Sequence, residues 1–220
     1  MASSQRIEQA FGALSLADVR LERERRAWRR DPVRYVREVF SAEPDAWQAK
    51  ALAAFPTTNR LAMRACKGPG KTTVLAWLIW HYLDTRPHPR VVATSISSDN
   101  LSGNLWRECA KWRGQSARLQ AEYDWTATRI RKRSAPATWT AEARSWPQTA
   151  DPTQQAETLA GIHEDYCLFV LDESGSIPQA VMATAEAVLS TGIETKIVQA
   201  GNPTQLDGPL YRACVTDRHL

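Results

Sequence analysis

A glycine-rich loop that ends in lysine and threonine has the residue types and spacing needed to bind a phosphate. It occupies positions 65–72 and reads Ala-Cys-Lys-Gly-Pro-Gly-Lys-Thr. Glycines let backbone N–H groups approach an anion, Lys71 can reach the β- and γ-phosphates, and the Thr72 hydroxyl can bind Mg²⁺. The alternative is a plain Gly-Pro turn before a buried helix. We predict a nucleotide site made of Ala65, Cys66, Lys67, Gly68, Pro69, Gly70, Lys71, Thr72 and Thr73.

An apolar run that ends in two acids is the second candidate for chemistry. Residues 167–171 are typical of a buried strand, and Asp172 and Glu173 follow it, as in a Walker B motif. Such carboxylates emerge at the sheet edge where α/β proteins bind ligands. We predict that Asp172 holds Mg²⁺ and that Glu173 orients or deprotonates the water that attacks the γ-phosphate. The alternative is that both acids cap the next helix.

Two side-chain amides complete the set. Asn202 lies in the segment Gly201-Asn202-Pro203-Thr204, at the tip of a strand expected to neighbour the first two, where it could sense the γ-phosphate. A simple Asn-Pro turn is the alternative. Gln48 follows Trp47 and could pair with an adenine edge, although glutamine is also an ordinary residue of exposed helices.

The elements that must position these residues alternate between strand and helix. Strand-like runs occupy 61–64, 90–95, 167–171 and 196–200, with helix-like runs at 73–80, 101–112 and 178–189. Alternation of this kind predicts an α/β fold with a parallel sheet covered by helices. Runs at 125–130 and 137–145 predict an added antiparallel hairpin. The stretch 147–157 is expected to be a loop.

The N-terminal part of the chain has a different character. Residues 5–40 mix opposite charges at helical spacing, which predicts a helical segment packed on the core. We therefore divide the chain into an N-terminal helical segment, 1–45, and an ATPase-type core, 46–220.

Composition restricts the class of protein. The chain has 220 residues, a net charge of +4 and no apolar run near the roughly 20 residues of a membrane span. Its four cysteines form no C-x-x-C pair, which argues against zinc and disulfide frameworks and favours a reduced compartment. The densest basic cluster is Arg129, Arg131, Lys132 and Arg133. It could touch DNA phosphates or a neighbouring subunit. We favour slightly the interpretation that these residues are simply the exposed tip of a hairpin.

Taken in order, these motifs resemble the N-terminal ATPase of a large terminase subunit, the DNA-packaging motor of tailed phages. Trp47-Gln48 is similar to the aromatic-Gln pair that contacts adenine in that family. The loop from Lys67 to Thr72 resembles the family's phosphate loop, which often lacks its leading glycine. The further matching segments are Gly161, Leu168 to Glu173, and Gly201 to Thr204 with Gly208 and Tyr211.

The resemblance implies a P-loop NTPase of the RecA-like (ASCE) type, with Glu173, Lys71 and Lys67 as catalytic residues. It implies hydrolysis of Mg-ATP to translocate double-stranded DNA into a procapsid, in the cytoplasm of an infected bacterial host. The implied partners are DNA, a portal protein, a small terminase subunit and like subunits in a ring, with no membrane. A helicase-like DNA-dependent ATPase and a nucleotide-dependent assembly switch are the alternatives.

The sequence departs from the family pattern in two ways. The position of a trans-acting arginine finger is occupied by Ala160, which leaves Arg144, Arg212 and Arg218 as finger candidates. The family continues into an RNase H-like nuclease with clustered acids, for which Asp207 and Asp217 are too few. We therefore expect no nuclease activity from this chain, and expect it to be a fragment or a split subunit.

Overall fold

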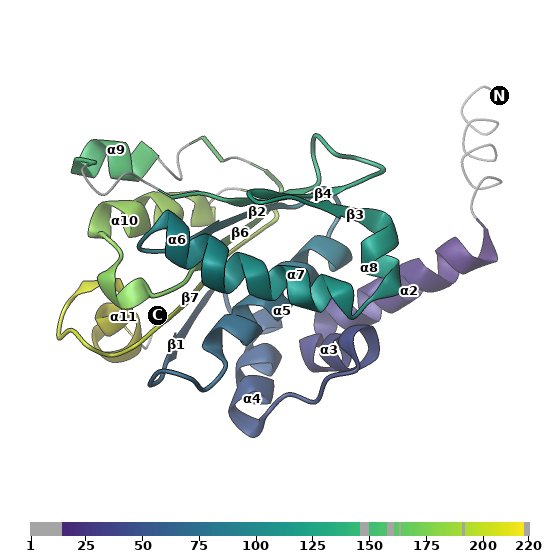
Figure 1. Cartoon of the computed structure of the whole chain (residues 1–220), viewed down its shortest axis with the longest axis horizontal. Helices are drawn as coiled ribbons and strands as arrows, with labels where there is room; N and C mark the ends of the chain where they lie inside the picture. Colours follow the sequence, from purple (N-terminus) through teal and green to yellow (C-terminus); the bar gives the residue numbers. More distant parts are fainter. Residues whose placement is uncertain (1–14, 146–149, 158–160, 163, 191, 218–220) are drawn as a thin grey trace.

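The computed structural model describes residues 15–145, 150–157, 161–162, 164–190 and 192–217, which form a seven-stranded sheet with helices on both faces (Figure 1). The strand order is β1-β7-β6-β2-β5-β4-β3. The neighbouring strands β1, β7, β6, β2 and β5 are parallel to one another. At one end of the sheet, β4 pairs antiparallel with both β5 and β3. Their bounds are β1 Arg60–Arg64, β2 Arg90–Thr94, β3 Tyr123–Trp125, β4 Arg129–Lys132, β5 Thr140–Ala143, β6 Tyr166–Leu171 and β7 Glu194–Gly201.

The predicted α/β fold, with a parallel sheet and an added antiparallel part, is confirmed. The strand that leads to Asn202 is β7, and it pairs with both β1 and β6, as expected. The hairpin differs in detail, because β5 itself pairs parallel with β2. The expected strand 125–130 is divided into β3 and β4, since Thr126 closes a turn by accepting a hydrogen bond from the Arg129 N–H at 3.0 Å.

Helices fill the connections. They are α2 Leu16–Arg30, α3 Pro32–Phe40, α4 Ala46–Ala54, α5 Lys71–Thr85, α6 Ser98–Asn100, α7 Arg107–Gly114, α8 Ala117–Glu122, α9 Pro152–Glu157, α10 Gln179–Ala187 and α11 Gly208–Tyr211. Single π-helical turns span Leu101–Trp106 and Arg212–Thr216. The expectation of a loop throughout 147–157 is wrong for its second half, because the Asp151 carboxylate accepts from the N–H groups of Thr153 and Gln154 and starts α9.

The apolar core lies on both faces of the sheet. Neighbouring strand residues point to opposite faces, so Val91 belongs to one cluster of buried side chains and Val92 to the other. The first cluster centres on α5, in which every residue from Val74 to Thr85 is buried. A helix that is apolar all round is stable only inside a protein, and α5 is enclosed by α2, α3, α4 and α7. The glycine-rich loop that precedes Lys71 therefore leads directly into a helix that is buried along most of its length.

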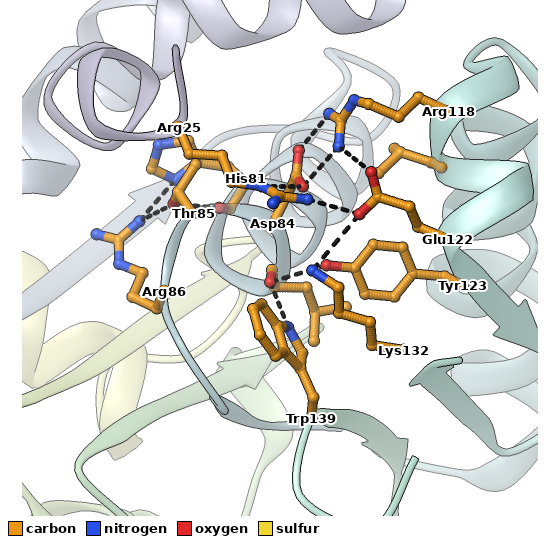
Figure 2. Close-up of polar contacts among 12 residues, drawn as sticks. Arg25, His81, Asp84, Thr85, Arg86, Arg118, Glu122, Tyr123, Lys132 and Trp139 are labelled. Carbon is orange, nitrogen blue, oxygen red and sulfur yellow. Dashed lines mark hydrogen bonds and ion pairs between the residues drawn. The ribbon is translucent and has the colours of Figure 1, made fainter. Parts of the chain in front are cut away.

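Charged side chains pin the N-terminal helices to this core (Figure 2). Asp84 of α5 is fully buried and pairs with Arg118 of α8 and, at 3.3 Å, with Arg25 of α2. Glu122 continues the network to Arg25 at 2.5 Å and to Lys132 of β4 at 3.5 Å. The boundary proposed at residue 45 stays a prediction, although Trp28, like α3, packs in the α5 cluster.

Replacing Asp84 by asparagine is expected to lower the free energy of unfolding by about 3 kcal/mol, because breaking a buried pair leaves its partners uncompensated. Urea unfolding of wild type and variant measures the change. Glu43→Gln is the matched control, since Glu43 pairs with Arg37 on an exposed surface and should show no measurable effect. Equal midpoints for the Asp84 variant and the control would contradict the assignment of this network as a structural anchor.

Among the described residues, none of the helices combines the length and the apolar character required to cross a bilayer.

Candidate active site

The loop between β1 and α5 is held open by two glycines in left-handed backbone conformation. Gly68 has φ 92° and Gly70 φ 91°, values that residues with a Cβ atom rarely adopt. A Cβ at Gly70 would also lie 2.6 Å from Gln48 Nε2. The loop leads into the N-terminus of α5, where free N–H groups and the helix dipole favour an anion. Its shape is that of a phosphate-binding loop.

Lys71 links this loop to the neighbouring strand. Its side chain is buried, and its Nζ donates to the carbonyl oxygens of Ala65 at 3.0 Å and Cys66 at 2.7 Å. The third bond, at 2.9 Å, goes to Oδ1 of Asn202, just beyond β7. The predicted Lys71 and Asn202 are thus in direct contact, although 131 positions separate them in the chain.

Asp172 and Glu173 lie beside the loop, at the carboxyl end of β6. Burial, and after it the charge of Glu173, raises the pKa of Asp172 to about 6. The Thr72 hydroxyl donates to the Asp172 carboxylate and opposes this rise. Glu173 has φ 54° and ψ 41°, an unfavourable conformation for a residue with a side chain. Strain of this kind concentrates at functional sites, where it aims a side chain.

Lys71, Glu173 and Asn202 line one cavity of about 600 Å³, whereas Asp172 is not among its lining residues. Its lining includes Lys67 and the rest of the loop to Thr72, together with Glu173 and Asn202. The size suits a nucleotide, because ligand pockets occupy roughly 300–1,000 Å³. Phosphate-binding, acidic and amide groups predicted from three separate segments therefore meet at the carboxyl edge of the parallel strands.

Comparisons with known proteins identify the fold. No protein-family model and no curated protein matches the sequence. Among solved structures, the HK97 bacteriophage large terminase matches with a TM-score of 0.63 and 13% identity, over 87% of this chain and 41% of that one. The large terminase ATPase domain of Thermus phage P74-26 matches with a TM-score of 0.60 and 19% identity, over 80% of this chain and 72% of that one. The chain has the fold of a large-terminase ATPase domain.

A third match is the large terminase of a thermophilic bacteriophage in complex with ADP, with a TM-score of 0.51 and 16% identity, over 72% of this chain and 37% of that one. The chain thus spans less than half of this terminase and of the HK97 terminase. The resemblance noted in the sequence is confirmed at the level of fold.

The oxygen atoms of Thr72 and Asp172 are of the kind that binds Mg²⁺. The buried Asp172 carboxylate has no ion-pair partner among the described residues, and it lies against the Thr72 hydroxyl. Nowhere in the described ranges do three His, Cys, Asp or Glu side chains form a cluster suited to a metal. Mg²⁺ does not need one, because it usually takes one or two protein oxygens and completes its shell with water and substrate phosphates.

Two glycines, Gly175 and Gly201, allow the turn after β6 to approach the end of β7 closely. A Cβ at Gly201 would lie 3.0 Å from the backbone nitrogens of Ser174 and Gly175, and one at Gly175 would lie 2.9 Å from the Asn202 carbonyl oxygen. Sequence reasoning missed Gly175, whose only signal is its position after the two acids. The close approach holds Asn202 beside the segment that carries Glu173.

We expect Gly201→Ala to lower the free energy of unfolding by about 1–3 kcal/mol, because the methyl group forces β7 away from the turn after β6. Thermal unfolding measures the loss, and nucleotide affinity should fall with it. Gly114→Ala is the control, since a Cβ at that helical position meets nothing within 4 Å. If both variants unfold at the wild-type temperature, the contact has no role.

Some predicted residues lie outside the cavity. Gln48 is buried, and its amide is occupied by the chain itself, with Nε2 3.5 Å from the Gly70 carbonyl and Oε1 2.9 Å from the Asp45 N–H. Trp47 is half-buried against the α5 cluster. Neither lines the cavity. An adenine contact by this pair stays a prediction, and the contact that the structure shows is the one between Gln48 and Gly70 of the loop.

Two of the arginine-finger candidates, Arg144 and Arg212, do not line the cavity. Arg144 pairs with Glu142 at 2.9 Å, and Arg212 lines a different hollow between β1 and α10. Ala160 and Arg218 lie outside the described residues. Their roles toward a neighbouring subunit stay predictions.

The basic cluster of the hairpin is largely neutralised. Arg129 pairs with Glu142 at 3.4 Å and Arg133 with Asp124 at 2.8 Å. Lys132 is buried, and its ammonium lies 3.7 Å from the centre of the Trp139 ring. These contacts favour a structural role over DNA binding for the hairpin.

The wall opposite the phosphate loop was not predicted. It comes from the π-helical turn and α7, and its members are Gly103, Asn104, Arg107, Glu108 and Lys111. Burial raises the pKa of Glu108, but hydrogen bonds from Lys111, Thr73 and Trp112 outweigh it and hold the pKa below its ordinary value. The available signal was the position of this segment after β2, since β2 ends at the same sheet edge.

Proposed function

We propose that this chain is the ATPase motor domain of a phage large terminase, which hydrolyses Mg-ATP to move double-stranded DNA into a procapsid. The observation that carries the proposal is the meeting of the phosphate loop, Glu173 and Asn202 in one cavity. The terminase fold supports it, as does the ADP held by one of the similar terminases.

Binding begins with the triphosphate on the loop and the N-terminus of α5. Lys71 would exchange its bonds to the Ala65 and Cys66 carbonyls and to Asn202 Oδ1 for bonds to phosphate oxygens, which releases Asn202. Thr72 and Asp172 would hold Mg²⁺. When bound, the ion neutralises charge that develops on the phosphates.

Hydrolysis then depends on Glu173, which lines the cavity without a cationic partner among the described residues. A carboxylate so placed can orient the attacking water and accept its proton. Lys67, which is exposed on the loop, would add positive charge near the γ-phosphate.

Coupling to movement follows from the Lys71–Asn202 bond. Because Lys71 donates to Asn202 Oδ1 at 2.9 Å and phosphate would compete for the same ammonium group, loss of phosphate would favour that bond and pull on the tip of β7. In the proposed motor, like subunits form a ring that works with a portal protein and a small terminase subunit in the host cytoplasm. These partners are inferred from the terminase resemblance alone.

The test is ATP turnover by wild type and Lys71→Ala, each with and without double-stranded DNA. We expect turnover by wild type that DNA stimulates, and none above background by the variant. Nucleotide binding with a change in oligomeric state but no sustained turnover would favour an assembly switch. Stimulation only by single-stranded DNA, with strand separation, would favour a helicase-like enzyme. Equal turnover by both proteins would refute an ATPase site at this loop.

A further inference from the structure

The wall of the cavity that faces the phosphate loop is built on an unusual helix. Between α6 and α7 the backbone forms a π-helical turn, Leu101–Trp106. Such turns are rare and recur at functional sites. This one ends directly before Arg107, so the first residue of α7 lines the cavity.

Helix α7 packs on α5 through several contacts, among them the Trp80 Nε1–H bond to the Cys109 carbonyl at 2.9 Å. Nearest the cavity, the contact is made by the Glu108 carboxylate. Glu108 accepts from the Thr73 hydroxyl at 2.8 Å, from the Trp112 Nε1–H at 2.8 Å and from the Lys111 ammonium at 3.0 Å. Thr73 lies two positions after the phosphate-loop lysine. The bond from Thr73 therefore ties the α7 wall of the cavity to the helix that begins at the phosphate loop.

Arg107 differs from its neighbours in having no partner. Lys111 is neutralised by Glu108, and Arg113 donates to the Tyr123 carbonyl at 2.8 Å. The Arg107 side chain is exposed, and it makes no hydrogen bond, ion pair or ring contact with any part of the chain that the structure describes. A planar guanidinium that faces a phosphate cavity without a carboxylate is free to bind phosphate oxygens in pairs.

We infer that Arg107 binds the γ-phosphate of the nucleotide from within the same chain and stabilises the charge of the transferred phosphoryl group. The inference rests on the proposed function, because it requires ATP in this cavity. It adds a catalytic residue that needs no neighbouring subunit, in contrast to Arg144 and Arg212. An arginine with this role is worth about 10³-fold or more in kcat.

The experiment compares wild type, Arg107→Ala and Arg107→Lys for ATP turnover and for affinity toward ADP and a non-hydrolysable ATP analogue. We expect Arg107→Ala to lower kcat roughly 10³-fold and to weaken analogue binding about tenfold, with ADP binding and thermal unfolding unchanged. Arg107→Lys should retain more of the wild-type analogue affinity than of the wild-type turnover. Lysine supplies the positive charge but cannot form the paired hydrogen bonds of the planar guanidinium. Arg20→Ala, an exposed change on α2, is the control.

Two outcomes would overturn the inference while leaving the proposed function intact. One is wild-type turnover by Arg107→Ala in an assay where Lys71→Ala is inactive. The other is an equal loss of ADP and analogue affinity, which would make Arg107 a general anchor. Absence of nucleotide binding by wild type would instead refute the proposed function itself.

Discussion

Replacing Glu173 by glutamine is expected to lower kcat for ATP hydrolysis by roughly 10²–10⁴-fold, the usual contribution of a general base. The amide keeps the shape of the side chain but cannot accept the proton of the attacking water. Nucleotide affinity should stay near wild type, because Glu173 is not part of the phosphate loop. Single-turnover hydrolysis and nucleotide titration separate the two effects.

Glu22→Gln serves as the control, since Glu22 is exposed on α2 and pairs only with Arg26 among the described residues. It should hydrolyse ATP like wild type. If the Glu173 variant also retained wild-type kcat, another group would have to activate the water. The left-handed backbone at Glu173 would then reflect only the tight turn before Gly175.

Asp172→Asn is expected to have opposite effects on activity and on stability. Turnover should fall by roughly 10²-fold or more, because the variant loses the charged group that we propose holds Mg²⁺. The nucleotide-free protein should become more stable by about 3 kcal/mol above pH 6, since a buried carboxylate with a pKa of about 6 is forced to ionise there. Thermal unfolding should therefore shift upward by roughly 6–10 °C.

The difference in the free energy of unfolding between the Asp172 variant and wild type should depend on pH. The pKa of Asp172 is raised in the folded protein, so its neutral form favours folding at low pH and this contribution is lost as the pH rises through about 6. The stability gap between variant and wild type should grow by about 1 kcal/mol from pH 5 to pH 8. A gap that does not change with pH would show that Asp172 is not ionising in a buried site.

Motifs made of residues close together in the chain could be predicted from the sequence, because their geometry depends only on those residues. A strand, a loop with glycines at two left-handed positions, and a helix that starts at Lys71 follow one another in the chain, so sequence order sets their shape. The same holds for Asp172 and Glu173 at the end of β6. The hairpin was read less well, because a single hydrogen-bonded turn at Thr126 divides what periodicity presents as one strand.

The glycine-rich loop, the acidic strand end and the α/β alternation follow from the amino-acid sequence, since each depends on residues close together in the chain. Three relations arise only in the folded chain: Lys71 bonds Asn202, Gly175 meets Gly201, and Arg107 lines the same cavity as the loop. These relations depend on strand order and on the clamp between Glu108 and Thr73. Contacts across a sheet arise from the packing of distant segments, and local residue patterns do not encode them.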